Sequence, residues 1–522
     1  MKNVKTYKDK QIAEAFFVID TSTDSGICKF CKQKKDQDHS KGHGNYASHA
    51  KLCRKQDWME RVDEYLEKGT AGQNTLPFVS DKGKSYYQWL DWVLSNNLPF
   101  SFVESAETKK YAGIVHNMCV DTFMKVLKTV GRKVASKIID DLPDSFGLII
   151  DGWDAGGGSH RTGIFAVFPD KSRQDLFAKT PLLAVSPMHD ETSFTASTMY
   201  TFIKGVLRKY QKSEDNVVFL VMDNTNVNHA LARCFEVPLI GCASHRLNLA
   251  AKKLFSEYEE ILTKVDAIMT KISTAKVSGA LREITDIGAK KRNTTRWSST
   301  HVFVTRYFEL KEHLLTLDDP EVTALMLTHA EDSELQVLRT KLKDFESCTK
   351  KLQFEEGISL STVRTLFDAL LSKYPEVCET HLAVSAAIIN SQAFETGIVK
   401  IVDGKKNELT DAEKEAVQCF KLNNRNANAA ASPEPDDFAS KALKQAKRQR
   451  VAEDDEYQQL SWIPPTSNVV ERLFSRAKLT LGTLRRSILP ENLEIILMLR
   501  ANRSLWDLRT VGELVMDPAN QF

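Results

Sequence analysis

The stretch from Asn216 to Lys253 constrains the fold more than any other part of the chain. The apolar run Val217 to Val221, followed by Met222 and Asp223, predicts a buried strand that delivers a carboxylate to the edge of a sheet. A helix-like stretch, a second apolar run and an amphipathic segment come next: 227–234, 237–242 and 247–255. This alternation indicates an α/β sheet layer. Taken alone, Asp223 is equally consistent with a plain turn, and His245 with a surface or helix-cap residue.

Length and composition limit the possible classes. A chain of 522 residues exceeds the usual size of one hydrophobic core, so several domains are expected. With 42% hydrophobic and 27% charged residues, the chain has the composition of a globular protein. No run of 18 apolar residues appears and the first residues lack the apolar core of a signal peptide, so neither a membrane nor a secreted role is expected. The nine cysteines are scattered and do not predict a disulfide framework.

The N-terminal 60 residues contain one cluster of metal-ligand types. Its members are Cys28, Cys31, His49 and Cys53. Two thiolates from a turn and a His/Cys pair from one helix face can form a tetrahedral zinc site, and the spacing resembles a BED-type zinc finger. His39 and His43 are nearby alternative ligands, and a chance cluster beside a solvated basic face is the alternative interpretation. Lysines suited to phosphate contact lie between the two halves: Lys32, Lys34, Lys35 and Lys41.

Three further strands are predicted upstream of Asp223. The run Phe146 to Ile150 ends on Asp151, and apolar runs at 163–168 and 181–186 follow before a helix at 195–210. A meander, a helix, a strand, a helix and a strand, with acids after the first and fourth strands, is the element order of an RNase H-like domain. Asp154 could replace Asp151, although we expect it on a loop, where a carboxylate would be held less firmly.

A series of short motifs then resembles the hAT superfamily of DNA transposases, the hobo and Activator-like group. The motifs are Asp151-Gly-Trp, Asp223-Asn, Cys242-Ala-Ser-His245-Arg-Leu-Asn-Leu, Thr295-Arg-Trp297-Ser-Ser, Ser467-Asn-Val-Val-Glu471-Arg-Leu-Phe-Ser475 and Arg485-Arg-Ser-Ile-Leu-Pro490. Together, in this order, they extend over most of the chain from the zinc finger to Leu505. The resemblance implies a DDE-type site in which Asp151, Asp223 and Glu471 bind Mg²⁺ and direct water, and then a DNA 3′-hydroxyl, at phosphates. Two Mg²⁺ ions about 3.5 to 4 Å apart can stabilise both the attacking and the leaving oxygen of such a reaction.

The same resemblance implies roles for three further residues. Trp297 would stack on a base displaced when the flanking DNA forms a hairpin. Arg296 and His245 would lie near the cleaved strand, as phosphate contacts or as organisers of the site. Outside this context Trp297 would be a half-buried anchor, Cys242 and His245 would be half of a zinc site without a second pair, and Glu471 would be a surface glutamate.

The domain organisation follows from these segments. We expect a zinc finger at 1–60, a helical region at 61–143, the first part of the RNase H-like core at 144–300 and an all-helical insertion at 301–460. The small, polar, proline-bearing segment 423–437 predicts a disordered linker, extended to 450 by a basic run at 441–450 that fits a nuclear localisation signal or a solvated helix face. Residues 461–522 would hold the last core helix and a dimerisation region. Their apolar surface needs a partner, which is either the core of the same chain or a second copy.

Three functions are consistent with these features. The first is a nuclear, DNA-binding, dimeric or larger transposase that uses structural Zn²⁺ and catalytic Mg²⁺ to cleave and transfer DNA strands. The second is a domesticated, non-catalytic zinc-finger regulator that binds DNA as a dimer. A cytosolic hydrolase or scaffold unrelated to DNA would make the zinc cluster and the acid series coincidences. Presence of all three candidate acids favours the first.

Overall fold

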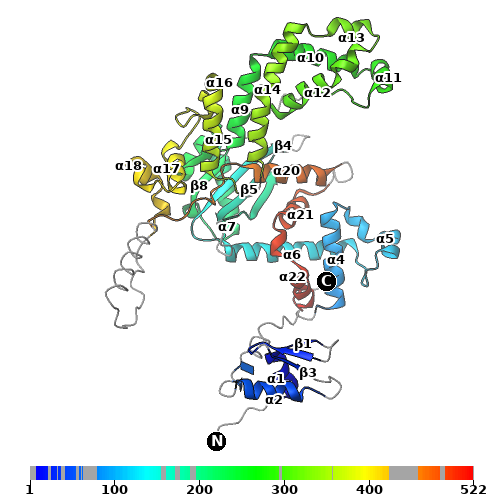
Figure 1. The fold of residues 1–522 in the computed structure, drawn as a ribbon, viewed down its shortest axis with the longest axis vertical. Coiled ribbons are helices and arrows are strands. Elements are labelled where there is room, and N and C mark those ends of the chain that lie inside the picture. Colours follow the sequence, from blue (N-terminus) through cyan, green and yellow to red (C-terminus); the bar gives the residue numbers. More distant parts are fainter. Residues whose placement is uncertain are drawn as a thin grey trace. The chain divides into compact units, whose positions relative to one another are not determined.

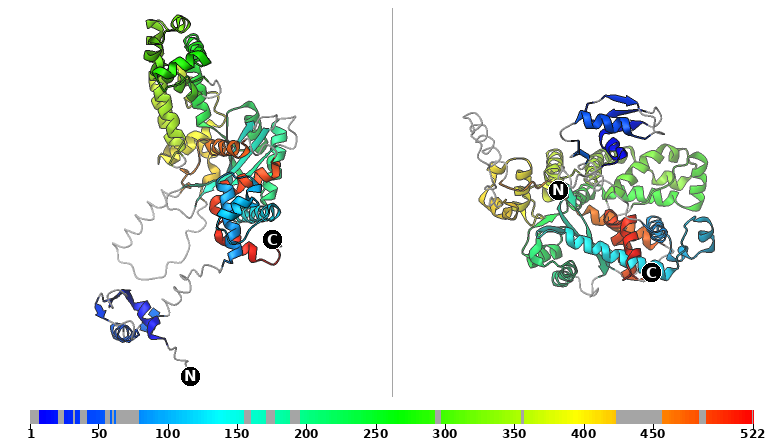
Figure 2. Two further views of the ribbon diagram at one scale, coloured as in Figure 1. Left: turned by 90° about the vertical axis from the view of Figure 1, so that its right-hand side faces the viewer. Right: turned by 90° about the horizontal axis from the view of Figure 1, so that it is seen from below.

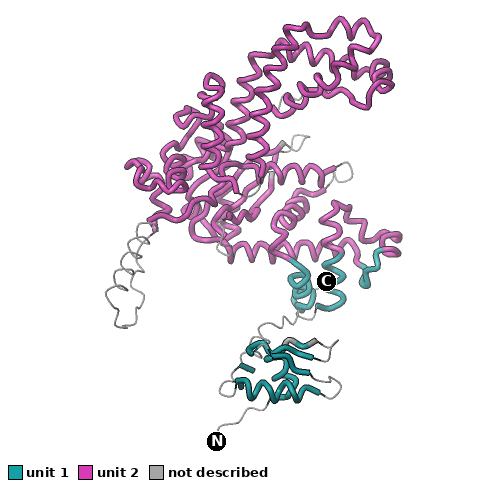
Figure 3. Tube along the Cα trace, viewed as in Figure 1, with its two compact units in different colours: residues 1–88, 112–117, 507–522 teal, residues 89–111, 118–506 magenta. Residues whose placement is uncertain are grey.

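The computed structural model describes residues 7–20, 25–31, 33–36, 42–54, 58–59, 61–62, 79–154, 160–170, 177–187, 195–292, 297–354, 357–422, 456–482, 488–520 and 522. The chain divides into two compact units (Figure 3). One comprises residues 1–88, 112–117 and 507–522, and the other comprises residues 89–111 and 118–506. Each unit is described by itself.

The first unit contains a small module with its own antiparallel sheet. The module's elements are α1 (Asp9–Phe16), β1 (Phe17–Asp20), β2 (Ser25–Cys28), β3 (Lys34–Asp36) and α2 (Gly44–Cys53). The strands pair in the order β1-β2-β3. Its centre is a compact apolar cluster that includes Ile12, Phe16, Phe17 and Tyr46. The module therefore buries a small core of its own, beyond what the zinc-ligand pattern alone predicted. In the same unit, α22 (Leu508–Met516) lies against residues 79–83.

The second unit is built on a six-stranded mixed sheet (Figure 1). The strands are β4 (Phe146–Asp154), β5 (His160–Pro169), β6 (Ala178–Lys179), β7 (Leu182–Pro187), β8 (Val217–Met222) and β9 (Leu239–Gly241). The main path is β6-β5-β4-β8-β9, and β7 also pairs with β5. β5 is antiparallel to β4, β6 and β7, whereas β8 and β9 run parallel to β4 and to each other. The apolar runs predicted β4, β5, β7, β8 and β9, whereas the two-residue strand β6 was not expected. β8 begins and ends where expected.

Helices account for most of the second unit. They are η2 (Phe100–Val103), α5 (Ala106–Tyr111), α6 (Val120–Asp141), α7 (Ala196–Lys209), η3 (Glu214–Asn216), α8 (Asn226–Phe235), α9 (Ala243–Ser256), α10 (Glu259–Ile272), α11 (Ala275–Ile284), α12 (Trp297–Leu315), α13 (Pro320–Leu325), α14 (His329–Leu352), α15 (Leu360–Lys373), α16 (Pro375–Leu382), α17 (Gln392–Val402), η4 (Lys406–Glu408), α18 (Asp411–Ala416), η5 (Gln418–Phe420), α20 (Asn468–Leu481), α21 (Pro490–Ala501) and η6 (Arg503–Leu505). α4 (Asp81–Ser95) contributes residues to both units.

The helical segment between α9 and α20 has two parts with different partners. Helices α10 to α14 extend away from the sheet (Figures 1 and 2) and share a core with α9, α15 and α16. In contrast, α17 places Phe394 and Ile398 in the core that covers one face of the sheet, and the segment around α18 adds Leu409 and Val417. The chain returns to this core through an isolated bridge between Lys421 and Tyr457. The predicted linker at 423–450 and its basic run lie outside the described residues.

The C-terminal helices α20 and α21 find their partner within the same chain. Val470, Leu473, Leu493 and Leu497 share one core cluster with strand residues such as Ile149. α21 also contacts β7 and α6. The core of the same chain therefore covers these apolar side chains of residues 461–522. The expected dimerisation is not tested by this packing.

Two expectations about local structure were wrong. The helical spacing of apolar residues across 109–135 predicts one long helix, but α5 ends at Tyr111, Gly113 adopts a φ of +64° and α6 begins only at Val120. A left-handed backbone interrupts a helix whatever the apolar pattern around it. β4 also continues past Asp151 to Asp154, so Asp151 lies inside a strand and Asp154 is not on a loop.

Across the described ranges, the chain contains no helix that combines the length and the apolar character needed to cross a bilayer.

Candidate functional site

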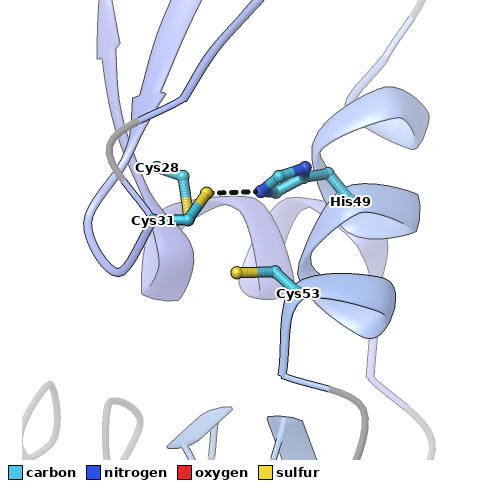
Figure 4. Close-up of side chains that lie close together, drawn as sticks. All are labelled: Cys28, Cys31, His49 and Cys53. Carbon is cyan, nitrogen blue, oxygen red and sulfur yellow. Dashed lines mark hydrogen bonds between the residues drawn. The ribbon is translucent and has the colours of Figure 1, made fainter.

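The zinc-ligand cluster of the first module forms as the sequence predicted. Cys28 ends β2 and Cys31 follows in the turn, while α2 contributes its two ligands from one helix face, four positions apart (Figure 4). The ligand atoms of the four residues all lie within 4.8 Å of one another: Cys28, Cys31, His49 and Cys53. Around a tetrahedral zinc ion, sulfur ligands at about 2.3 Å from the metal would lie roughly 3.8 Å apart, so only a small inward movement is needed. His43 does not belong to the cluster, and His39 lies outside the described residues.

The electrostatics of this cluster fit a cation. The Sγ of Cys31 lies 3.2 Å from the Nε2 of His49. Burial, together with the neighbouring Cys31 thiol, raises the pKa of the Cys53 thiol to about 11. Burial and the charge of Lys35 lower the pKa of His49, which favours the neutral imidazole that binds metals. Crowded thiols and a neutral imidazole are the donor set of a structural Zn²⁺ site.

The two aspartates of the predicted acid site lie side by side. β4 and β8 are adjacent and parallel, and Ile149 pairs with Val221 in their register. Asp151 and Asp223 each lie two residues further along, at the carboxyl end of the sheet, where open α/β sheets bind ligands. The strand pairing therefore accounts for the meeting of two acids that are distant in the chain.

Glu471 reaches this edge because α20 packs across β4 and β5. Asp151 is registered with Gly163 on β5. A Cβ at Gly163 would lie 2.7 Å from Val470 and 3.2 Å from Phe474, so α20 lies directly on the glycine. The ring of Phe474 also stacks on Trp153, with centroids 5.4 Å apart. Glu471 follows Val470 on this helix, and its side chain is half-buried.

The charges of the two neighbouring acids act on Asp151. Burial, followed by the negative charges of Asp223 and of Glu471, raises the pKa of Asp151 to about 7. The backbone N–H of Gly152, 2.8 Å from Oδ1 of Asp151, opposes this shift. An acid cluster whose burial disfavours its own ionisation is typical of a cation site.

His245 lies against Asp223. The Nδ1 of His245 is 2.9 Å from the Oδ2 of Asp223, and this hydrogen bond raises the pKa of the imidazole. The backbone explains the approach, since the N–H of Cys242 donates to the carbonyl of Met222 and so fixes the start of α9 beside the end of β8. Of the two roles implied for His245, this geometry fits the organiser of the site.

The motif containing Cys242 has a structural role that the sequence did not reveal. Its thiol is fully buried and accepts a hydrogen bond from the backbone N–H of Ser467, at 3.4 Å. The N–H of Ala243 donates to the carbonyl of Pro465. Asn468 donates from its side chain to the carbonyl of Leu352. These bonds fix the N-terminus of α20 and hence the position of Glu471.

Asn224, named before only as part of the Asp223-Asn motif, makes a close contact of its own. The side-chain amide of Asn224 packs against Gly241. A Cβ atom added to Gly241 would lie 2.1 Å from the Oδ1 of Asn224. Both polar atoms of the amide are buried without a hydrogen-bond partner in the described part of the chain. Gly241 was a partial sign of this contact in the sequence, because a glycine inside a strand often marks the close approach of another group.

The predicted DNA contacts have mixed outcomes. Trp297 begins α12 with 4% of its surface exposed, packed edge-on against Phe345, so its indole has no free face for a base. The role of an anchor in the helical core fits this position, and base stacking does not. Arg296 and Lys32 lie outside the described residues. Lys34 is exposed and Lys35 half-buried on the edge strand β3.

The three acids are chemically suited to Mg²⁺ but are not drawn tightly together. Carboxylate oxygens are the ligands that Mg²⁺ prefers. However, the zinc cluster is the only group of three or more His, Cys, Asp or Glu ligand atoms within 4.8 Å of one another among the described residues. Asp151, Asp223 and Glu471 thus share an electrostatic environment at a longer spacing.

Comparison of the chain with protein-family models and with curated proteins found no match.

Proposed function

We propose that the chain is a DNA transposase of the hAT type, which cleaves and transfers DNA strands at Asp151, Asp223 and Glu471 by metal-dependent phosphoryl transfer. The observation that carries the proposal is the placement of α20 over Gly163, which brings the charge of Glu471 to Asp151 on β4, beside Asp223 at the end of the adjacent parallel strand β8. Acids assembled from three distant segments have no evident structural purpose, because their repulsion disfavours the folded state.

The sheet supports the fold expected of such an enzyme. An antiparallel strand lies between β4 and β7, and two parallel strands follow on the other side of β4. This is the mixed sheet anticipated from the order of an RNase H-like domain. The helices from α10 to α18 fall between the second and third acids, as an insertion of that family would.

Each residue of the site has a defined task in this proposal. Asp151, Asp223 and Glu471 would hold Mg²⁺, which supplies stabilisation of the attacking and leaving oxygens of the phosphodiester. His245 restrains the carboxylate of Asp223 through the 2.9 Å hydrogen bond. Cys242 keeps α20 in register with the sheet through the N–H of Ser467.

The zinc module would deliver the DNA. A structural Zn²⁺ on Cys28, Cys31, His49 and Cys53 would hold β2 against α2. Lys34 and Lys35 on the edge strand then present positive charge to phosphates. DNA as a substrate places the protein in the nucleus, and the need to hold two element ends favours at least a homodimer.

The test is a cleavage assay on duplex DNA that carries the terminal sequences flanking the coding region, with and without Mg²⁺. The variants Asp151→Asn, Asp223→Asn and Glu471→Gln remove one ligand charge each with little change in volume. We expect each to lower the rate at least about 100-fold, because electrostatic stabilisation of a phosphoryl-transfer transition state is lost. Glu491→Gln, at an exposed position in the first turn of α21, is the matched control and should cleave normally.

The outcomes separate the proposal from its alternative. Zinc-dependent DNA binding without cleavage by the unaltered protein would favour the non-catalytic dimeric regulator. Cleavage that survives Glu471→Gln would remove Glu471 from the site and reject the three-acid arrangement.

A further inference from the structure

Arg246 follows His245 on α9, and its side chain is buried against the helical insertion. The Nε of Arg246 donates a hydrogen bond to the carbonyl of His381 at 2.9 Å. Its Nη2 lies 3.4 Å from the carbonyl oxygens of both Leu382 and Ala383. These carbonyls lie at the C-terminal end of α16, which is the negative end of that helix. Arg246 therefore ties α9 to α16.

Glu395 is buried beside this arginine, and its two carboxylate oxygens have different partners. The Nη1 of Arg246 lies 3.3 Å from Oε2. The backbone N–H of Gly241 donates to Oε1 at 3.1 Å. Both contacts counter the effect of burial, which raises the pKa of Glu395. Glu395 belongs to α17, so one carboxylate of the insertion binds both ends of segment 241–246, which contains His245.

The start of α17 also covers the outer edge of β9. In the described part of the chain, β9 is the last strand on its side of the sheet. The Oγ of Ser391 accepts from the N–H of Leu239 at 3.0 Å, and Glu395 accepts from Gly241, two residues further along. Side chains of the insertion thus take the place of a further strand. They fix the strand from which α9 departs.

Segment 241–246 leads directly to the acid site. Gly241 packs against Asn224, the residue after Asp223. Four residues later, the Nδ1 of His245 lies 2.9 Å from the Oδ2 of Asp223. Because Glu395 holds both ends of the segment, release of either end would move the imidazole relative to the aspartate.

We propose that Glu395 and Arg246 are positioning residues, which hold His245 in the orientation that restrains Asp223. Apolar side chains could fill the same space with a smaller desolvation penalty than a buried ion pair. A carboxylate that binds two ends of one short segment instead fixes the geometry of what lies between them. The effect on cleavage rests on the proposed strand-cleaving function, whereas the orientation of His245 can be measured without it.

Glu395→Gln tests this contact with little change in volume. An amide has one acceptor oxygen where a carboxylate has two, so glutamine can accept from one end of the segment and not from both. At pH 9, the hydrogen bond to Asp223 keeps the neutral imidazole of His245 protonated on Nδ1. Nitrogen-15 NMR of the full chain, labelled in histidine, measures this tautomer, and the spectrum of His245→Gln assigns the signal. We expect Glu395→Gln to lower the Nδ1–H population at least about twofold.

Glu413→Gln is the matched control. Glu413 is 7% exposed, against 8% for Glu395, and it accepts from Lys400 and from the backbone N–H of Thr410, both within the insertion. Glu413→Gln should lower the unfolding temperature and leave the tautomer of His245 unchanged. In the cleavage assay, Glu395→Gln should lower kcat at least about tenfold with little change in the KM for DNA. Glu413→Gln should change neither.

A double variant separates positioning from stability. Arg246→Met with Glu395→Leu replaces the ion pair by apolar side chains of similar volume, a change that is often neutral for stability. We expect an unfolding temperature near that of the wild type, with the same loss of the Nδ1–H form. The wild-type tautomer in folded Glu395→Gln or in the folded double variant would overturn the proposal.

A wild-type kcat in a variant whose tautomer has changed would equally overturn it. Absence of cleavage by the unaltered protein would reject the proposed strand-cleaving function alone, because the tautomer of His245 is measured without DNA.

Discussion

The Nδ1 of His245 lies 2.9 Å from the Oδ2 of Asp223, so the imidazole and one acid of the candidate site act as a unit. The hydrogen bond raises the pKa of His245 above its ordinary value. The protonated imidazole is thus favoured in the folded protein, where it offsets part of the negative charge that gathers around Asp151.

This pair predicts a pH-dependent contribution to stability. Because the folded pKa of His245 is raised, its contribution is fully present below the unfolded value of about 6.5 and is lost as pH rises through the folded value. Replacement by glutamine should therefore lower the unfolding temperature at pH 6, by the equivalent of roughly 1 kcal/mol, and much less at pH 8.5. Thermal unfolding of both proteins across this range checks the prediction. A difference that stays constant with pH would show that the pair does not titrate.

At Asp151 we expect a substitution to increase the stability of the protein, whereas the substitution of His245 lowers it. Its folded pKa of about 7 is far above that of an unfolded aspartate, so folded-state stability falls as pH rises from about 4 to 7. Asp151→Asn removes this penalty and should stabilise the metal-free protein by roughly 1 to 4 kcal/mol at pH 8. Mg²⁺ should stabilise the wild type at that pH and not the variant. Denaturant unfolding with EDTA or with Mg²⁺ measures both effects, and equal responses to Mg²⁺ would argue against ligation by Asp151.

We expect a larger side chain at position 163 to reduce both the stability of the protein and its proposed DNA cleavage. An added methyl group would meet Val470 at 2.7 Å, so α20 must shift away from β5. Gly163→Ala should destabilise the protein by about 1 to 3 kcal/mol and reduce DNA cleavage together. Gly205→Ala in α7 is the control, because nothing lies within 4 Å of its Cβ position and alanine favours a helix. Normal cleavage by a destabilised Gly163→Ala protein would separate α20 from the site.

The zinc cluster predicts selective unfolding on metal removal. The full chain should bind about one Zn²⁺ per molecule with these four ligands. Cys53→Ser should abolish this binding and expose residues 9–53 to protease while the mixed sheet stays protected. Cys119→Ser, at an exposed cysteine that is not one of the four ligands, should retain the metal. Metal analysis and limited proteolysis follow the two effects. Full zinc retention by Cys53→Ser would reject the site.

The parts of the fold that depend on local pattern were predictable. The run Val217 to Val221 and the acid after it specified β8, and the Cys-x₂-Cys spacing with its His/Cys pair specified the zinc cluster, because periodicity and ligand spacing are read over a few residues. The helix break at Gly113 was missed because the apolar pattern continues across it.

The parts that depend on distant packing were not predictable from residues alone. Nothing in the sequence around Glu471 shows that a glycine on β5 admits its helix, so only a resemblance singled it out. Trp297 likewise carries no local sign that Phe345 and the helical core enclose it. The buried thiol of Cys242 is explained only by the N–H of Ser467, far along the chain.

The late position of α20 and α21 in the chain bears on truncated forms of the protein. Both helices supply apolar side chains to the core over the sheet. A transcript that stops before Asn468 would encode β4, β5 and β8 with one face stripped of this cover. We expect such a product to aggregate or to be degraded, so a form truncated before α20 would not accumulate in the cell.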